Sequence, residues 1–174
     1  MAAQERLTVR NGDVLDAASV AAALAGADAA VCAIGPAKNS QPGTLISDGA
    51  KNILAGCASA GVRRFVYESG MMAGDGSELS FTGRLAIRFA HVFLRKLYAE
   101  KVIAEAAVQA SGLGWVIVRP PMLEHGPAKA NYLAGPRARI SPAKAISHAD
   151  CAALLVEAAT TPKWVRQVVN IGRA

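Results

Sequence analysis

Four short groups of residues carry side chains and backbone positions that could bind a flat, polar ligand. Gly35 would let such a ligand approach the backbone closely, Asp13 offers a carboxylate that can accept a hydrogen bond from an exocyclic amine, and Ser69 offers a hydroxyl that both donates and accepts. Together these residue types predict a nucleotide site. The four groups are Gly12–Asp13–Val14, Gly35–Pro36, Tyr67–Glu68–Ser69 and Pro120–Pro121–Met122.

Each group also has a purely structural interpretation. Gly35–Pro36 can simply end a strand, Asp13 can be a turn residue that bonds its own backbone, and Ser69–Gly70 can be the start of a loop. No group is specific by itself. The nucleotide site is favoured because all four follow successive predicted strands, and ligands of open parallel sheets bind beyond the carboxyl ends of the strands.

The elements that must position these residues alternate between short apolar runs and longer helical patterns, which is typical of a parallel sheet with crossover helices. Asp16 and Ser147 are the expected caps of the first and last helices. We predict helices over 17–25, 45–60, 84–110 and 148–160, and loops over 70–83 and 122–147. The five predicted strands are Leu7–Arg10, Ala29–Ile34, Arg64–Ser69, Trp115–Val118 and Gln167–Ile171.

Length and composition indicate one globular domain over residues 1–174. The chain is 52% hydrophobic and 18% charged, and a chain of this size buries roughly 70% of its unfolded surface, so its core needs neither disulfides nor metal. Cys32, Cys57 and Cys151 are far apart in apolar surroundings, which predicts three reduced, buried thiols. We therefore expect a cytoplasmic protein.

Composition also argues against several classes of function. The three histidines, His91, His125 and His148, lack the spacing of a metal site, so no metal is expected. The apolar tract from Val20 to Ile34 is interrupted and too short for a membrane span. The formal charge is +6, but the basic residues are dispersed and aromatic residues make up only 5% of the chain, which argues against nucleic acid.

Five strings in order resemble the atypical short-chain dehydrogenase/reductases, and the likeness is greatest to the NAD(P)H-dependent flavin reductase and biliverdin-IX-beta reductase group. The resemblance covers nearly the whole chain. Its most specific part is the RPP turn followed by a Gly-Pro loop and Tyr132. The strings are GDVLD, AVCAIGP, DGAKNILAGCASAGVRRFVYESG, SGLGWVIVRPP and ISHADCAALLVEA.

The resemblance implies a Rossmann-like fold and a role for each candidate residue. Asp13 and Val14 would flank the adenine, and Gly35 and Pro36 would lie against the central ribose and diphosphate. Tyr67 and Ser69 would lie beside the nicotinamide, and Lys101 would reach its ribose. The backbone of Pro120, Pro121 and Met122 would contact the carboxamide. Ser69 and Lys101 are thereby the expected catalytic residues, and the alternative for Lys101 is an ion pair with Glu105.

Two features depart from the family pattern. Most short-chain dehydrogenases carry Tyr-x-x-x-Lys on the long helix, whereas here Leu97 lies four residues before Lys101 and Tyr98 is one position out of register. Tyr98 and Lys101 can share a helix face, but not in the usual geometry, because one residue turns the side chain by about 100°. Carbonyl reduction with a tyrosine acid is therefore disfavoured.

The second departure is the absence of the Gly-rich strand-turn-helix segment with which sequences of the family begin and which binds the pyrophosphate. We expect an N-terminally truncated form of a longer reductase, whether by gene annotation, cloning or real loss. The first three helices would then cover one face of the sheet, because crossovers are right-handed. The other face would lose most of its cover, and a partner or a second copy could bind there.

The expected function is that of an NAD(P)H-dependent oxidoreductase of the flavin reductase type, which transfers hydride from nicotinamide to a flavin or a similar small conjugated acceptor. The cofactor is NAD or NADP, and the resemblance favours NADP. The alternative is a non-catalytic member that senses dinucleotide or binds a protein. An epimerase or dehydratase is a third interpretation, and the out-of-register Tyr98 counts against it.

Overall fold

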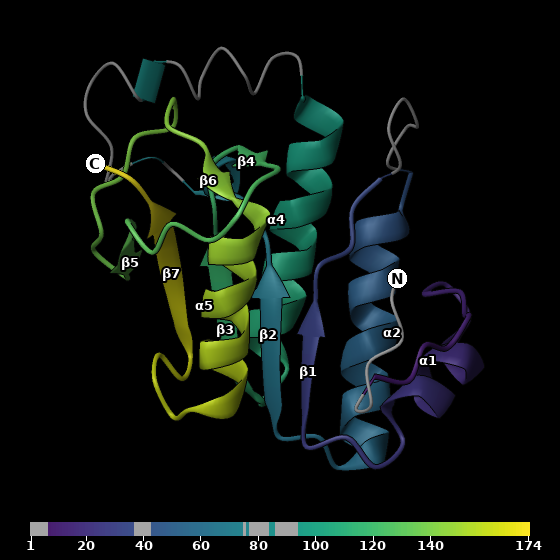
Figure 1. The fold of residues 1–174 in the computed structure, drawn as a ribbon. Helices are drawn as coiled ribbons and strands as arrows, with labels where there is room; N and C mark the ends of the chain where they lie inside the picture. Colours follow the sequence, from purple (N-terminus) through teal and green to yellow (C-terminus); the bar gives the residue numbers. More distant parts are fainter. Residues whose placement is uncertain (1–6, 37–42, 75, 77–83, 86–93) are drawn as a thin grey trace.

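The computed structural model describes residues 7–36, 43–74, 76, 84–85 and 94–174. Its main sheet has the strand order β1-β2-β3-β7-β5. Four strands, β1 (Ala29–Cys32), β2 (Arg64–Glu68), β3 (Gly114–Arg119) and β7 (Gln167–Gly172), run parallel. The edge strand β5 (Leu133–Gly135) is antiparallel to β7. This mostly parallel sheet with crossover helices is the predicted α/β, Rossmann-like architecture (Figure 1).

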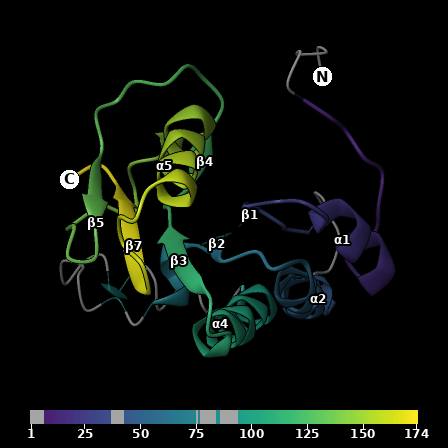
Figure 2. The ribbon, with the colours of Figure 1, turned by 90° about the horizontal axis from the view of Figure 1, so that it is seen from below.

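Helices pack on both faces of the sheet. Two of them, α2 (Leu45–Ala60) and α4 (Arg95–Ala110), lie against one face, and α5 (His148–Thr160) lies against the other (Figure 2). Phe65, Tyr67 and Ile117 point to the α2 and α4 side, whereas Val66, Val116 and Val118 pack against α5. This alternation follows from the period of two along a strand. All six side chains are fully buried.

The strand predicted at Leu7–Arg10 is wrong. These residues are exposed and form no strand, and the segment runs beside α1 (Ala17–Leu24), away from the sheet (Figure 2). A strand needs a neighbour for its backbone N–H and C=O groups, and no described strand lies beyond β1. The segment is instead held by side chains: Arg10 Nη1 donates to Ala22 O at 2.8 Å, and Ser19 Oγ accepts from Asp13 N at 3.1 Å.

The expected loss of cover on the second face is also wrong for most of the sheet. The α5 side chains of Cys151, Leu154 and Leu155 cover the centre of this face. The apolar side of α5 is itself buried by packing against the strands. Only at β1, the edge strand, does the predicted bare surface appear, where Val31 is 45% exposed. The first helix, α1, does not cover the sheet either, since it packs on α2.

A glycine lies where α1 packs on α2. A Cβ placed on Gly56 would lie 2.8 Å from Leu24 Cδ1 and 3.2 Å from Val20 Cγ1, so a larger residue would force these side chains to move. The predicted N-caps are confirmed: Asp16 accepts a hydrogen bond from Ala18 N, and Ser147 accepts one from Asp150 N. The three cysteines are free and buried, as predicted.

Two predicted segments contain more structure than expected. The loop predicted over 122–147 includes β5 and two short parallel strands, β4 (Leu123–Glu124) and β6 (Ile146–Ser147). The loop predicted over 70–83 opens with the 3-10 helix η1 (Met71–Ala73), in which Met71 is buried; residues 75 and 77–83 lie outside the described part. The helix predicted over 84–110 begins later than expected: α4 starts at Arg95, and its N-cap Leu94 has non-helical backbone angles (φ −108°, ψ 22°). Residues 86–93 lie outside the described part.

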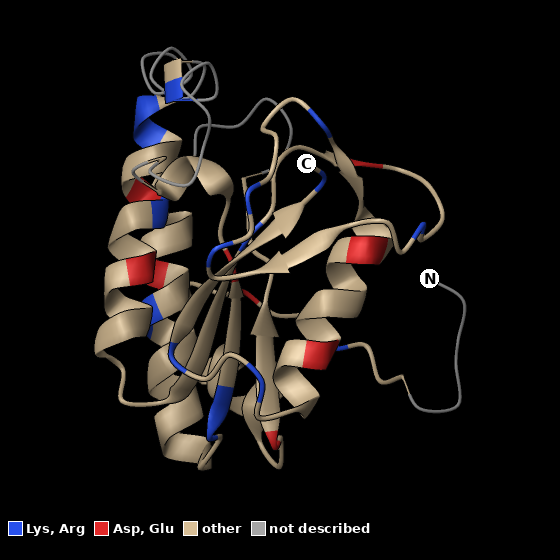
Figure 3. Cartoon of the chain, turned by 90° about the vertical axis from the view of Figure 1, so that its left-hand side faces the viewer, with Lys and Arg blue, Asp and Glu red and all other residues tan. Residues whose placement is uncertain are grey.

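Within the described part of the chain, no helix is both long and apolar enough to cross a lipid bilayer. The described Lys and Arg residues are dispersed over helices, strands and loops (Figure 3). Among the described residues, no three His, Cys, Asp or Glu side chains come together in a metal-binding group; His125 and His148 stack with ring centroids 4.9 Å apart. His91 lies outside the described residues.

Candidate functional site

A cavity of about 540 Å³ lies at the carboxyl ends of β2 and β3. Its wall is mostly apolar, with only four polar side chains among the described lining residues. Four segments supply the wall: the end of β2 with η1, one face of α4 with its N-cap residue, the turn between β3 and β4, and the approach to β6. Their lining residues are Glu68–Met72; Leu94, Leu97, Tyr98 and Lys101; Pro120–Leu123; and Pro142–Ala143.

Lys101 joins α4 to the end of β2. Its Nζ donates a 2.5 Å hydrogen bond to the backbone carbonyl of Ser69, and Ser69 N in turn donates to Val118 O of β3 at 2.8 Å. The alternative ion pair between Lys101 and Glu105 does not form, because Glu105 pairs with Arg119 at 2.6 Å. The ammonium group of Lys101 is therefore held at the cavity wall.

Ser69 presents an unsatisfied hydroxyl beside the cavity. The residue is only 3% exposed, and among the described residues its buried Oγ has no hydrogen-bond partner. A buried hydroxyl without a partner costs about 1–3 kcal/mol, so a group that hydrogen-bonds to Ser69 Oγ would be favoured there. Ser69 and Lys101, the two predicted catalytic residues, thus lie together at one cavity.

The turn after β3 contributes a continuous stretch of wall. Pro120, Pro121 and Met122 all line the cavity, and Met122 is 67% exposed. Two of their carbonyls already accept backbone hydrogen bonds: Pro120 O from Met71 N at 2.9 Å, and Met122 O from Ile146 N at 3.1 Å. These bonds fix the turn against η1 and β6, since proline cannot extend the β3 ladder itself.

The four predicted residues near the N-terminus form a separate group that does not line this cavity. Asp13 Oδ1 accepts from Leu15 N at 2.9 Å, which is the structural alternative considered for it. Val14 packs with Ile34 over Gly49 of α2, and Val14 O accepts from Asn52 Nδ2 at 3.0 Å. Gly35, which precedes Pro36 after β1, has open space where a Cβ would stand.

Tyr67 is not brought to the cavity. Its ring is fully buried between the sheet and the helices α2 and α4, because the strand alternation sends it to the face opposite Glu68. Its hydroxyl has no hydrogen-bond partner among the described atoms. Burial, with the nearby Cys32 thiol adding a smaller effect, raises the pKa of Tyr67 well above its usual range. Proton donation by Tyr67 is thereby disfavoured.

Sequence reasoning missed several of the lining residues. Leu94 and Leu97 recur with Tyr98 and the predicted Lys101 at the i, i+3, i+4, i+7 spacing of one helix face, and this signal could have placed both leucines in the wall. Glu68 was named only within the group Tyr67–Glu68–Ser69. Pro142 and Ala143 reach the cavity from a segment without a readable pattern. The predicted loops over 70–83 and 122–147 also contribute Met71, Met72 and Leu123 to the wall.

Burial shapes the charges at the wall. Desolvation lowers the pKa of Lys101, against the opposing effects of Glu68 and Glu105. Desolvation raises the pKa of Glu68, against the opposing effects of Lys101 and His148. Both shifts favour the neutral form, as expected when water is replaced by an apolar wall. Such perturbed groups in a cavity are typical of functional sites.

Comparison with known proteins agrees with this geometry. Residues 1–162 match a family model described as NAD(P)H-binding. The fold is similar to the oxidoreductase ylbE from Lactococcus lactis, with 18% identity and a TM-score of 0.79 over 99% of this chain and 74% of that one. It is also similar to a short-chain dehydrogenase/reductase from Veillonella parvula in complex with NADP, with 17% identity and a TM-score of 0.74 over 98% and 74% of the two chains.

A further similar structure is ChuY from Escherichia coli, described as an anaerobillin reductase, with 25% identity and a TM-score of 0.74. The similarity covers 93% of this chain and 73% of ChuY. The fold and the family match support an NAD(P)H-dependent oxidoreductase, in agreement with the resemblance found in the sequence. Because the family model covers most of the chain, this protein belongs to the NAD(P)H-binding family.

Proposed function

We propose that the cavity at the ends of β2 and β3 holds the nicotinamide of NADH or NADPH together with a flavin or a similar small conjugated acceptor. One observation carries this proposal: Ser69, whose buried Oγ has no partner among the described residues, and Lys101, whose ammonium bonds the Ser69 carbonyl, both line the same apolar cavity. Residues 1–174 would then act as one dinucleotide-binding domain.

The described residues fit the nicotinamide end of the cofactor. Ser69 offers a hydroxyl without a partner among the described residues, and Lys101 offers a cation. They do not supply a grip for the pyrophosphate. The N-terminus of α2 already bonds a carboxylate of the chain, because Ser47 N donates to Glu100 Oε2 at 3.1 Å, and an anion at that site would meet this carboxylate.

Each residue of the wall would have a defined role in a bound complex. Reduced nicotinamide supplies hydride, and the protein supplies orientation and exclusion of water. Lys101 would bond the ribose hydroxyls while fixed by the Ser69 carbonyl, and Ser69 Oγ would gain its missing partner. Pro120, Pro121 and Met122 would close the wall on the carboxamide side, and Asp13 and Val14 would lie toward the adenine.

The acceptor class follows from the wall chemistry. Met71, Met72, Leu97 and Met122 offer polarizable, adaptable contacts, which suit a broad flat molecule better than a small polar one. The similar protein ChuY is described as a reductase of anaerobillin, and the Veillonella protein was solved with NADP. These likenesses support a conjugated acceptor, and with the sequence resemblance they favour NADP over NAD.

The test measures dinucleotide binding and turnover in the same samples. We expect NADPH to bind, as followed by the fluorescence of reduced nicotinamide, and to be oxidised when FMN or biliverdin is added. Lys101→Met should weaken binding about tenfold, the loss of one charge-assisted hydrogen bond. Lys51→Met is the matched control, because Lys51 is exposed on α2 and pairs with Asp48.

Other results would exclude the proposal in different ways. Binding of NADPH without oxidation by any acceptor would favour the dinucleotide sensor over the enzyme. Turnover that is equal in Lys101→Met and Lys51→Met would place the reaction elsewhere. Absence of both binding and turnover would show that this cavity is not a dinucleotide site of the chain.

A further inference from the structure

Glu68, the last residue of β2, supplies the only acidic side chain among the described residues that line the cavity. The other polar side chains of this wall are Ser69, Tyr98 and Lys101. Nothing in the proposed binding of the cofactor uses Glu68. Glu68 and Ser69 follow one another in the chain, and both residues line the cavity.

The Glu68 carboxyl is not neutralised by a neighbour. Within the described residues it takes part in no ion pair or side-chain hydrogen bond, and the Lys101 ammonium, which also lines the cavity, donates to the carbonyl of Ser69. A carboxyl that is partly buried in an apolar wall without a bonded cation is more stable with its proton than an exposed one.

Four titratable groups face Glu68 from the elements packed around it: Lys101 from α4, His148 and Cys151 from α5, and Cys32 from β1. Lys101 and His148 lower the pKa of Glu68, but burial is the larger effect and raises it. His148 is exposed at the start of α5, so solvent reaches the group that faces Glu68 from the outside.

We propose that Glu68 is the proton donor of the reduction. This inference rests on the proposed function and assigns the second half of that chemistry. The acceptor gains two electrons and one hydrogen as hydride from reduced nicotinamide, which is thereby oxidised. The acceptor gains its second hydrogen as a proton from the Glu68 carboxyl, which becomes a carboxylate and regains a proton from solvent. Atoms and charge balance without a further reactant.

The test compares Glu68→Gln with the control variant Glu157→Gln. Glu157 is a partly exposed residue of α5 that pairs with Lys163. General acids contribute about 10²-fold or more to turnover, so kcat with FMN should fall by about 10²-fold in Glu68→Gln only. The wild-type kcat should fall as pH rises through the pKa of Glu68, because the protonated form is active. This dependence should be absent in Glu68→Gln and retained in Glu157→Gln.

Isotope effects separate the two hydrogens. Deuterated reduced nicotinamide should lower kcat in both wild type and Glu68→Gln. D₂O should lower kcat in wild type but not in Glu68→Gln. A readout without turnover is the pH titration of the Glu68 carboxyl carbon by NMR in the unliganded chain, which should give a pKa above the usual value of a glutamate.

Three results would overturn the inference. One is an unchanged kcat and pH profile in Glu68→Gln while wild type turns over, which leaves the proposed function intact. Another is a Glu68 carboxyl that titrates at or below the usual pKa of a glutamate in wild type, a result that needs no variant to fold. The last is binding of NADPH without reduction of any acceptor, which removes the proposed function and this step with it.

Discussion

Arg119 and Glu105 form a two-pronged ion pair, with Nη2 2.6 Å from Oε2 and Nε 3.1 Å from Oε1. Their side chains are 13% and 5% exposed. The pair joins the end of β3 to α4, one helical turn beyond Lys101, and Arg119 Nη2 also reaches Ala73 O at 3.4 Å. Three walls of the cavity are therefore fixed to one another by a single guanidinium.

Breaking this pair on one side should destabilise the fold strongly. We expect Glu105→Gln to lower the free energy of unfolding by about 3–5 kcal/mol, because it removes the carboxylate that pairs with the mostly buried Arg119 guanidinium. Removing both charges in Glu105→Leu/Arg119→Met should cost much less, since the buried guanidinium is removed together with its carboxylate. Urea unfolding of the single and double variants measures this. If the single and the double variant lose the same free energy of unfolding, packing and not charge accounts for the loss.

Ser69→Ala should separate binding from stability. The variant removes a buried hydroxyl that has no partner, so the free energy of unfolding should stay the same or rise slightly. The dissociation constant for NADPH should rise roughly 3- to 10-fold, the worth of one hydrogen bond. Ser59→Ala is the control, because Ser59 Oγ bonds Ala55 O on the exposed side of α2. If the dissociation constant for NADPH is unchanged in Ser69→Ala as well as in Ser59→Ala, Ser69 serves only to begin the loop.

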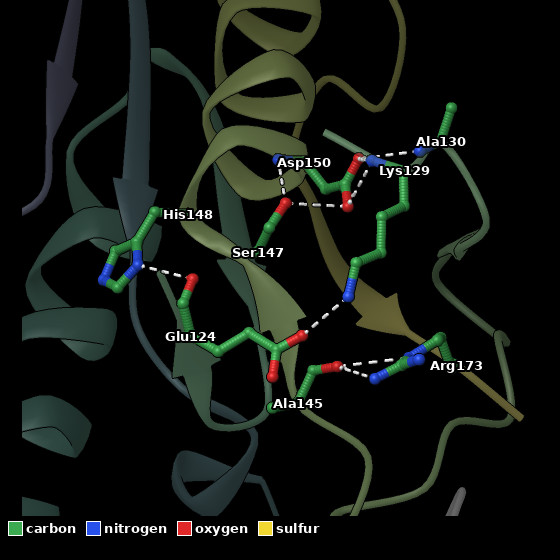
Figure 4. Close-up of polar contacts among 8 residues, drawn as sticks. All are labelled: Glu124, Lys129, Ala130, Ala145, Ser147, His148, Asp150 and Arg173. Atoms are coloured by element: carbon green, nitrogen blue, oxygen red, sulfur yellow. Dashed lines mark hydrogen bonds and ion pairs between the residues drawn. The ribbon is translucent and has the colours of Figure 1, made fainter. Parts of the chain in front are cut away.

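Asp150 makes stability depend on pH. Its carboxylate accepts from Ala130 N, Lys129 N and Ser147 Oγ (Figure 4). These bonds, that of Ala130 first, lower the pKa of Asp150 below its usual value. A lowered folded-state pKa gives stability that is present above the unfolded pKa of about 4 and is lost as pH falls through the folded pKa.

Asp150→Asn should therefore unfold at lower temperature than wild type at neutral pH, and the difference should shrink as the solution is acidified below about pH 4. Thermal unfolding over a pH series measures it. Glu124→Gln, whose exposed ion pair with Lys129 is worth little, should show no such trend. If the difference in melting temperature between Asp150→Asn and wild type stays constant with pH, the variant loses only the hydrogen-bond geometry of Asp150 and not the effect of its charge.

Gly49→Ala should disturb the N-terminal group of candidate residues. The added Cβ would lie 3.0 Å from both Ile34 Cδ1 and Val14 Cγ2. Overpacking of this kind costs about 1–3 kcal/mol, which exceeds the gain of about 1 kcal/mol from replacing a helical glycine. We expect a lower melting temperature and weaker NADPH binding in Gly49→Ala, and a partly recovered melting temperature in Val14→Ala/Gly49→Ala, which removes the contacts with Val14. Additive losses in the double variant would contradict the contact.

The sequence by itself determined the elements whose pattern is local. The helix at 148–160 was correctly predicted from its cap and apolar stripe, and β2, β3 and β7 from their apolar runs. Periodicity and capping are properties of neighbouring residues, so one chain suffices to find them. The ends of β2 and β3 were likewise predicted to share one edge, and Ser69 and Pro120 do line one cavity.

Tertiary structure decided what the pattern left open. Leu7–Arg10 reads as a strand, but pairing requires a neighbour that the described sheet does not provide. Tyr67 and Glu68 are adjacent in sequence, and only the packing of α4 and α5 on opposite faces determines which of them meets the cavity. Asp13 and Gly35 lie apart from that cavity because their position depends on how α1 packs on α2. Contacts between distant segments carry no local signal, and so the shape of the site becomes known only when the chain is folded.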